Sequence, residues 1–281
     1  DTAHCIECGL CYDVCGRDAI LKEDREEDIT VEAGSIIVAC GYDLFDARRK
    51  EQYRYLELPD VVTALEFERM MNASGPTGGE IRRLSTGKVP RSVVFVQCVG
   101  SRDISVGRPY CSGICCMYAI KNAILLKEKY PGTDVTILYM DIRAYGKGYE
   151  EYYQRAIEAG VRFIRGMPGE ILGEGEELLL RVENTETGEI EDLRPELVVL
   201  STGLEPAADS GAIGEMLGLP REPTGFFKPL DEKVDTVATV RPGIYLAGTV
   251  TAPRDIPDCV AQSGAAAMRA FIDAVRDRTS R

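Results

Sequence analysis

The pattern of apolar and polar positions predicts an α/β fold in the middle of the chain. A run of apolar residues over 92–100 is typical of a buried strand, and 115–130 has the periodicity of an amphipathic helix. A second apolar run over 134–142 predicts another buried strand. A strand, a helix and a strand in this order form a unit with a parallel sheet.

The same alternation continues toward residue 206. We expect a helix over 150–160, a strand over 161–166 and a hairpin that turns near 186–188. The next apolar run, over 195–203, predicts a further buried strand. This order of elements indicates a nucleotide-binding type of α/β core.

The flanking segments predict parts of a second unit. A strand is expected over 29–43, with its tip at Gly41, and a helix over 61–72. Near the other end, 242–250 predicts a buried strand that is followed by a helix over 259–278. Before these elements, we expect a cysteine-rich turn and a short helix near 13–18. We therefore divide the chain into four segments, 1–28, 29–88, 89–206 and 207–281.

Composition excludes some classes of protein. A net charge of −13 and a single histidine argue against nucleic-acid binding, because a phosphate backbone needs a basic surface. No run approaches the roughly 20 apolar residues that a membrane-spanning helix needs. The chain opens on Asp1, which suggests a piece of a longer protein, and its ten clustered cysteines favour metal ligation in a reducing compartment, the cytoplasm.

The first cysteine set has the C-x2-C-x2-C-x3-C spacing of bacterial ferredoxins, which holds a 4Fe-4S cluster. Gly16 follows its last cysteine where proline is usual. In ferredoxins with two clusters the fourth cysteine ligates the other cluster, so both assignments of that residue stay open. Zinc is the rival metal, although zinc sites favour two separated pairs of ligands. The set comprises Cys5, Cys8, Cys11 and Cys15.

The second cysteine set matches no standard spacing. Its first member ends the strand over 92–100 and the other three enter the helix over 115–130, where thiolates gain from backbone N–H groups. Spacing alone leaves three interpretations: a metal cluster, a redox disulfide, or buried structural thiols. The set comprises Cys98, Cys111, Cys115 and Cys116.

Two similar strand ends, in AGSIIVACGYD and GIYLAGTV, are typical of flavoproteins with two dinucleotide-binding folds. In such proteins these tips, and the helix start after the last one, approach FAD. No G-x-G-x-x-G follows any strand, which disfavours NAD(P) and leaves the FAD domain incomplete. The candidate FAD-binding residues are Cys40, Gly41, Gly248, Thr249, Asp255, Ile256 and Ser263.

Three further residues lie near these features. Cys40 and Cys259 each stand beside a strand tip, and isolated cysteines are usually small buried apolar residues. Lys121 follows Cys116 in the same helix, where it can stabilise a reduced, anionic flavin, although a helical lysine is usually solvated.

The chain resembles the iron–sulfur flavoprotein component of heterodisulfide reductase and its relatives, which include the quinone-interacting oxidoreductases of sulfate reducers. The segments that carry the resemblance are CIECGLCYDVCGRDAI, IIVACGYDLFDARRK, LEFERMMNASGPTGG, VVFVQCVGSRD, YCSGICCMYAIK, YMDIRAYGKGYEEYY, FIRG, VVLSTGLEP and GIYLAGTVTAPRDIPDCVAQSGAAA.

The resemblance implies a thioredoxin-reductase-like fold with FAD, a ferredoxin-like segment, and a 4Fe-4S cluster at the second cysteine set. It makes Lys121 and Glu68 candidates for catalytic residues near the flavin. It also implies electron transfer between FAD and clusters, including flavin-based bifurcation. The implied partners are the other components of such a complex and hydrogenase or ferredoxin-type electron donors.

Two competing functions stay open. One is a zinc-bearing interaction module without redox activity. The other is a thiol–disulfide oxidoreductase that uses Cys115 and Cys116, although adjacent cysteines form a strained ring.

Overall fold

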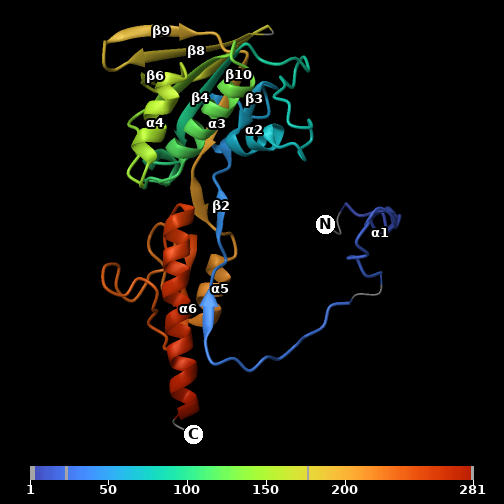
Figure 1. The fold of residues 1–281 in the computed structure, drawn as a ribbon, viewed down its shortest axis with the longest axis vertical. Coiled ribbons are helices and arrows are strands. Elements are labelled where there is room, and N and C mark those ends of the chain that lie inside the picture. The colour runs from blue at the N-terminus through green and yellow to red at the C-terminus, as the bar shows by residue number, and fades with distance from the viewer. Residues whose placement is uncertain (1–3, 23–24, 176, 280–281) are drawn as a thin grey trace. The chain divides into compact units, whose positions relative to one another are not determined.

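The computed structural model describes residues 4–22, 25–175 and 177–279, and it divides into two compact units, Asp1–Ala33 and Gly34–Arg281 (Figure 1). The first unit contains one short helix, α1 (Leu10–Asp13). None of its described residues is buried. Burial of apolar side chains therefore contributes little to its stability, and another interaction must hold its turns.

A five-stranded parallel sheet forms the centre of the second unit. Its strand β10 is buried at every residue, as expected for a parallel strand that is covered on both faces. The sheet order is β3-β10-β4-β5-β6, and the strands are β3 (Val61–Thr63), β4 (Ser92–Val99), β5 (Asp134–Tyr139), β6 (Arg162–Arg165) and β10 (Leu197–Thr202).

Alternate residues of β4 serve opposite cores, because neighbouring side chains of a strand point to opposite faces. Phe95 packs with the helices α2 (Ala64–Met71), α3 (Cys115–Lys129) and α4 (Tyr149–Glu158), and it meets Phe67 edge to face at 5.3 Å between ring centroids. Val94 and Val96 pack with the other layer. That layer is an antiparallel sheet of β7 (Ile171–Glu174), β8 (Glu177–Asn184) and β9 (Glu189–Leu193), visible in Figure 1.

Smaller elements complete the second unit. Strand β1 (Ile36–Val38) pairs in parallel with β12 (Ile244–Leu246), and β2 (Tyr42–Leu44) pairs antiparallel with β11 (Leu204–Pro206). The remaining helices are α5 (Ser210–Leu217) and α6 (Ile256–Thr279), with 3-10 turns at Ala47–Arg49, Glu51–Tyr53, Ile104–Val106 and Gly248–Val250.

Most predicted elements of the central unit are confirmed, and three predictions elsewhere were wrong. Helix 61–72 begins as strand β3, since Thr63 caps α2 in a capping box with Glu66. The helix near 13–18 lies instead at Leu10–Asp13, and the strand over 29–43 is reduced to β1 and β2. The sheet thus includes residues 61–63. The boundaries of the four predicted segments stay a prediction.

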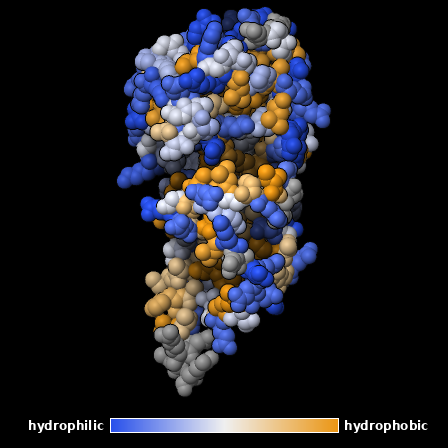
Figure 2. Space-filling view, turned by 90° about the vertical axis from the view of Figure 1, so that its right-hand side faces the viewer, coloured by the Kyte–Doolittle hydropathy of each residue, from blue (hydrophilic) through white to orange (hydrophobic). Residues whose placement is uncertain are grey.

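No described helix is long and apolar enough to cross a membrane. On the face that Figure 2 presents, apolar side chains form separate patches between hydrophilic ones.

Candidate metal centres and cofactor cavity

The first cysteine set lies on the turns around α1. Cys5, Cys8 and Cys11 are exposed and Cys15 is half-buried. The backbone N–H of Glu7 donates to the Cys5 sulfur at 3.4 Å, and that of Ala19 donates to the Cys15 sulfur at the same distance. Backbone N–H groups, with that of Ala19 first, lower the pKa of the Cys15 thiol. Such N–H groups favour a negatively charged sulfur, which is the form that binds iron.

The second cysteine set gathers where β4 ends and α3 begins. Cys98, the last residue but one of β4, takes a left-handed conformation (φ 56°) where the register with β10 is irregular. Cys115 and Cys116 occupy the first two positions of α3 and are buried, and Cys98 and Cys111 are half-buried. The helix start has no side-chain cap. The Gly113 N–H donates to the Cys111 sulfur at 3.3 Å.

The thiols of this set act on one another electrostatically. Burial first, and then Cys116, raise the pKa of the Cys98 thiol to about 12. Burial, followed by Cys98 and Cys116, also raises the pKa of the Cys115 thiol. The Cys116 thiol pKa is raised chiefly by burial, with Cys111 adding to it. The fold therefore brings all four predicted ligands together.

The donor types of both sets fit iron–sulfur clusters, which are held by four thiolates. Among the residues that the structure describes, no three histidine, cysteine, aspartate or glutamate side chains already converge on a metal position. Each thiol must lose its proton to ligate a cluster. The assignment of the eight cysteines as ligands stays a prediction.

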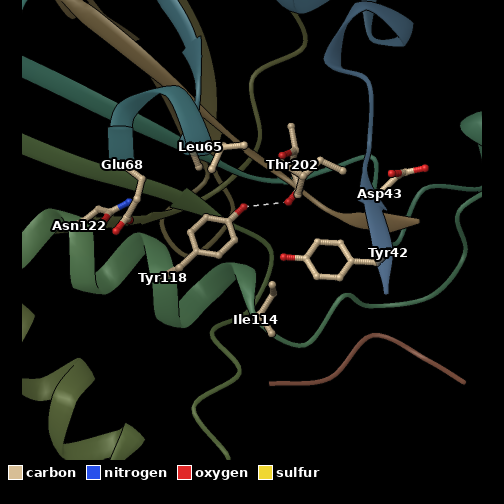
Figure 3. Close-up of a pocket in the computed structure, with 10 residues that line it drawn as sticks. Tyr42, Asp43, Leu65, Glu68, Ile114, Tyr118, Asn122 and Thr202 are labelled. Atoms are coloured by element: carbon tan, nitrogen blue, oxygen red, sulfur yellow. Dashed lines mark hydrogen bonds between the residues drawn. The ribbon is translucent and has the colours of Figure 1, made fainter. Parts of the chain in front are cut away.

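Two cavities lie beside the second set. The first has a volume of about 500 Å³ and is lined by residues of β2, α2, α3 and β10. Figure 3 shows Tyr118 rising from α3 toward Thr202, while Tyr42 points from β2 into the same space. The Tyr118 hydroxyl donates to the Thr202 carbonyl at 2.8 Å. The lining residues are Tyr42, Asp43, Leu44, Ala64, Leu65, Glu68, Ile114, Tyr118, Asn122 and Thr202.

The second cavity, of about 740 Å³, extends from α3 to the start of α6. It shares Tyr42, Ile114 and Tyr118 with the first cavity. Its wall is mostly apolar and aromatic, with a few polar groups, as in sites for planar cofactors. The predicted FAD-binding residues in this wall are Thr249, Asp255, Ile256 and Ser263. Cys259, which was not among the predicted FAD-binding residues, also lines it.

The two predicted catalytic residues meet at the cavities. Glu68 lines the first cavity and Lys121 lines the second. The Lys121 Nζ lies 2.6 Å from both carboxylate oxygens of Glu68. Both side chains are partly exposed, so the ion pair itself contributes little stability. It places a cation and a carboxylate together at the cavity edge.

Three predicted FAD-binding residues do not line either cavity. Cys40 lies in an apolar cluster with Val38 and Leu246, and its sulfur is 3.7 Å from the Ser210 hydroxyl. Gly41 (φ 80°) and Gly248 (φ 75°) take conformations that glycine favours, next to Tyr42 and Thr249. Their predicted role is untested.

Sequence reasoning missed most of the cavity wall, including Tyr118, Tyr42 and Asn122. Tyr118 follows Cys115 by three positions in a helix, so this spacing was a usable signal. Tyr42 follows the strand tip at Gly41 directly. Asn122 is almost fully buried, and neither of its amide atoms has a hydrogen-bond partner among the described residues. No pattern in the sequence distinguishes it.

Comparison with known proteins identifies the first unit. Residues 1–21 match the family model of the 4Fe-4S binding domain. This match confirms the predicted iron–sulfur character of that segment.

Two curated relatives match nearly the whole chain. The iron-sulfur component of CoB–CoM heterodisulfide reductase from Methanocaldococcus jannaschii is 53% identical over 270 residues, which cover 95% of this chain and 41% of that protein. The corresponding component of the H2:CoB-CoM heterodisulfide,ferredoxin reductase from Methanothermobacter thermautotrophicus is 47% identical, with 98% and 42% covered. The chain thus spans about two fifths of the length of these relatives.

Solved structures confirm the predicted fold class. Thioredoxin reductase from T. acidophilum matches with a TM-score of 0.54 at 17% identity, and the match covers 86% of this chain and 66% of that one. Thioredoxin reductase from Lactococcus lactis matches over the same shares, with a TM-score of 0.53 at 21% identity. The α/β chain therefore has part of the thioredoxin-reductase fold.

Proposed function

The chain belongs to the family of the iron–sulfur flavoprotein component of heterodisulfide reductase, of which it spans about two fifths, and we propose that it relays electrons between FAD and 4Fe-4S clusters in a complex of that kind. The observation that carries the proposal is the position of the second cysteine set beside the cavities. The Thr202 carbonyl accepts from the Cys115 sulfur at 3.7 Å and from Tyr118 at 2.8 Å, and both Thr202 and Tyr118 line the first cavity.

In this proposal the cavities hold the isoalloxazine of FAD. Bound FAD exchanges electrons singly or in pairs, whereas a cluster exchanges one at a time. The Lys121 ammonium stabilises negative charge on a reduced ring, and Glu68 holds that ammonium in place through the 2.6 Å contact. Tyr42 and Tyr118 supply aromatic surface that excludes water.

The same proposal includes electron bifurcation and contact with partner proteins. The resemblance supports division of an electron pair between a low-potential acceptor and a high-potential disulfide. It also supports contact with the other components of the complex and with hydrogenase or ferredoxin-type donors, in the cytoplasm. The names of two relatives mention H2, formate and ferredoxin for those proteins.

Anaerobic purification of the polypeptide that contains this chain tests the proposal. Iron, sulfide and flavin are quantified, and we expect about four iron and four sulfide for each cluster together with bound FAD. Zinc without iron would support the interaction module instead. Protein without iron or flavin, but with rapid thiol–disulfide exchange at Cys115 and Cys116, would support the disulfide oxidoreductase. That outcome is disfavoured because a disulfide between adjacent residues closes a strained ring.

A further inference from the structure

One backbone carbonyl joins the second cysteine set to the cavity wall. The Thr202 carbonyl accepts hydrogen bonds from the Tyr118 hydroxyl at 2.8 Å and from the Cys115 thiol at 3.7 Å. Tyr118 and Cys115 are three positions apart on α3, so their side chains lie on the same face of the helix. The phenol oxygen and the sulfur are therefore neighbours around a shared acceptor.

A third group at this place has no partner. Ser201, the residue before Thr202 on β10, is fully buried, and its hydroxyl makes no hydrogen bond with any described residue. A buried hydroxyl without a hydrogen-bond partner destabilises the folded state. In a native protein such a group calls for an explanation, and a role at a redox site is one of them.

The pKa values of the Cys115 thiol and the Tyr118 hydroxyl depend on each other, and that of Tyr118 also depends on Ser201. Burial raises the pKa of the Cys115 thiol, and a side-chain hydrogen bond with Tyr118 opposes that shift. Burial, and then Cys115, raise the pKa of the Tyr118 hydroxyl well above its usual value, whereas an interaction with the Ser201 hydroxyl acts in the opposite direction. Tyr118 thus lies within reach of both Ser201 and Cys115.

Ligation to iron reverses the role of the Cys115 sulfur. A thiol donates its proton to Thr202, but a thiolate ligand has no proton and only accepts. The Tyr118 hydroxyl becomes a donor to the sulfur by rotation about its C–O bond. Thr202 lines the first cavity, and its carbonyl is then free to accept another hydrogen bond.

We propose that Ser201 and Tyr118 form a hydrogen-bond relay onto the ligand sulfur of Cys115. In this relay the Ser201 hydroxyl donates to the Tyr118 oxygen, and the Tyr118 hydroxyl donates to the sulfur. The inference rests on the proposed cluster at the second cysteine set. Hydrogen bonds to cluster sulfurs stabilise the more negative, reduced state and so raise the reduction potential. Tyr118 is then a positioning residue that adjusts the cluster nearest the flavin cavity.

The test measures reduction potentials by redox titration with EPR, using the polypeptide that contains this chain. Cys111→Ser first identifies which signal belongs to the second set. We expect Tyr118→Phe to keep the iron content and to lower the potential of that cluster, and Ser201→Ala to lower it by a smaller amount. The double variant is expected to match Tyr118→Phe, because Ser201 acts only through Tyr118. Tyr42→Phe, which removes a hydroxyl from the same cavity, is the matched control.

A second measurement separates this role from packing. ENDOR of the reduced cluster should detect an exchangeable proton coupled to the second cluster, and Tyr118→Phe should remove that coupling while Tyr42→Phe keeps it. Equal potentials and equal couplings in Tyr118→Phe and Tyr42→Phe would overturn the relay and leave the proposed cluster intact. The absence of any signal that Cys111→Ser removes would overturn the cluster, and the relay with it.

Discussion

The two cysteine sets place the same kind of ligand in opposite surroundings. Cys5, Cys8 and Cys11 are exposed on a segment with no buried residue among those described, and backbone N–H groups lower the pKa of the Cys15 thiol. At the second set, burial raises the pKa of the Cys98 thiol to about 12. The first set therefore has no buried core around it, whereas two members of the second set belong to the buried core.

Substitution of one cysteine in either set should have the largest effect, and the iron content measures it. Cys11→Ser should remove the first cluster and Cys111→Ser the second, each with a loss of about four iron atoms per chain. Iron analysis and EPR of anaerobically prepared protein measure this. Cys40→Ser is the control, because Cys40 belongs to neither set. Loss of both clusters from either variant would contradict the independence of the sites.

The next effect tests which set depends on the core. Phe95 is fully buried between α2 and α3, so Phe95→Ala should reduce the free energy of unfolding of the second unit by about 3–5 kcal/mol. Leu10→Ala, at an exposed residue of α1, should change the free energy of unfolding of its own unit by less than about 0.5 kcal/mol. Denaturant titration followed by circular dichroism gives both values. Equal changes in the free energy of unfolding for Phe95→Ala and Leu10→Ala would contradict the difference between the two units.

In metal-free protein, the different pKa values of Cys98 and Cys15 should give their thiols different pH dependences of alkylation. A thiol with its pKa at about 12 is ionised in roughly one molecule in ten thousand at pH 8, so Cys98 should react slowly with iodoacetamide. The lowered pKa of Cys15 makes its thiolate more abundant at the same pH. The alkylation rate of Cys15 should level off first as pH rises, while that of Cys98 continues to rise toward pH 12. Mass spectrometry of peptides at several pH values measures both rates; identical pH profiles would contradict this prediction.

The smallest expected effect concerns how helices begin in the two units. Gly9 precedes helix α1 and provides no side-chain cap, whereas Thr63 caps α2. Thr63→Ala should reduce the free energy of unfolding of the second unit by about 1 kcal/mol. Thr63→Ser retains the hydroxyl and is the matched control. If both variants unfold at the same denaturant concentration, the cap contributes nothing.

Local signals predicted much of the central unit. Strands β4 and β5 and helix α3 were found from apolar runs and helical periodicity, which act over neighbouring residues. The prediction for 61–72 was wrong at its start, because residues 61–63 became a strand by pairing with Val198–Leu200, far along the chain. The expected strand over 29–43 shrank to two short pieces for the same reason, since its partners lie beyond residue 203.

Sequence alone determined the candidate ligands of the first set, because their spacing is a local property of one turn-rich segment. The resemblance indicated Lys121 and Glu68 near a flavin, and the strand ends indicated Thr249 and Asp255. Only the tertiary structure brought Cys98 beside Cys115, paired Lys121 with Glu68, and set Tyr118 and Cys115 on one carbonyl. These contacts join strands and helices that are distant in sequence, and parallel pairing across the sheet decides which of them meet.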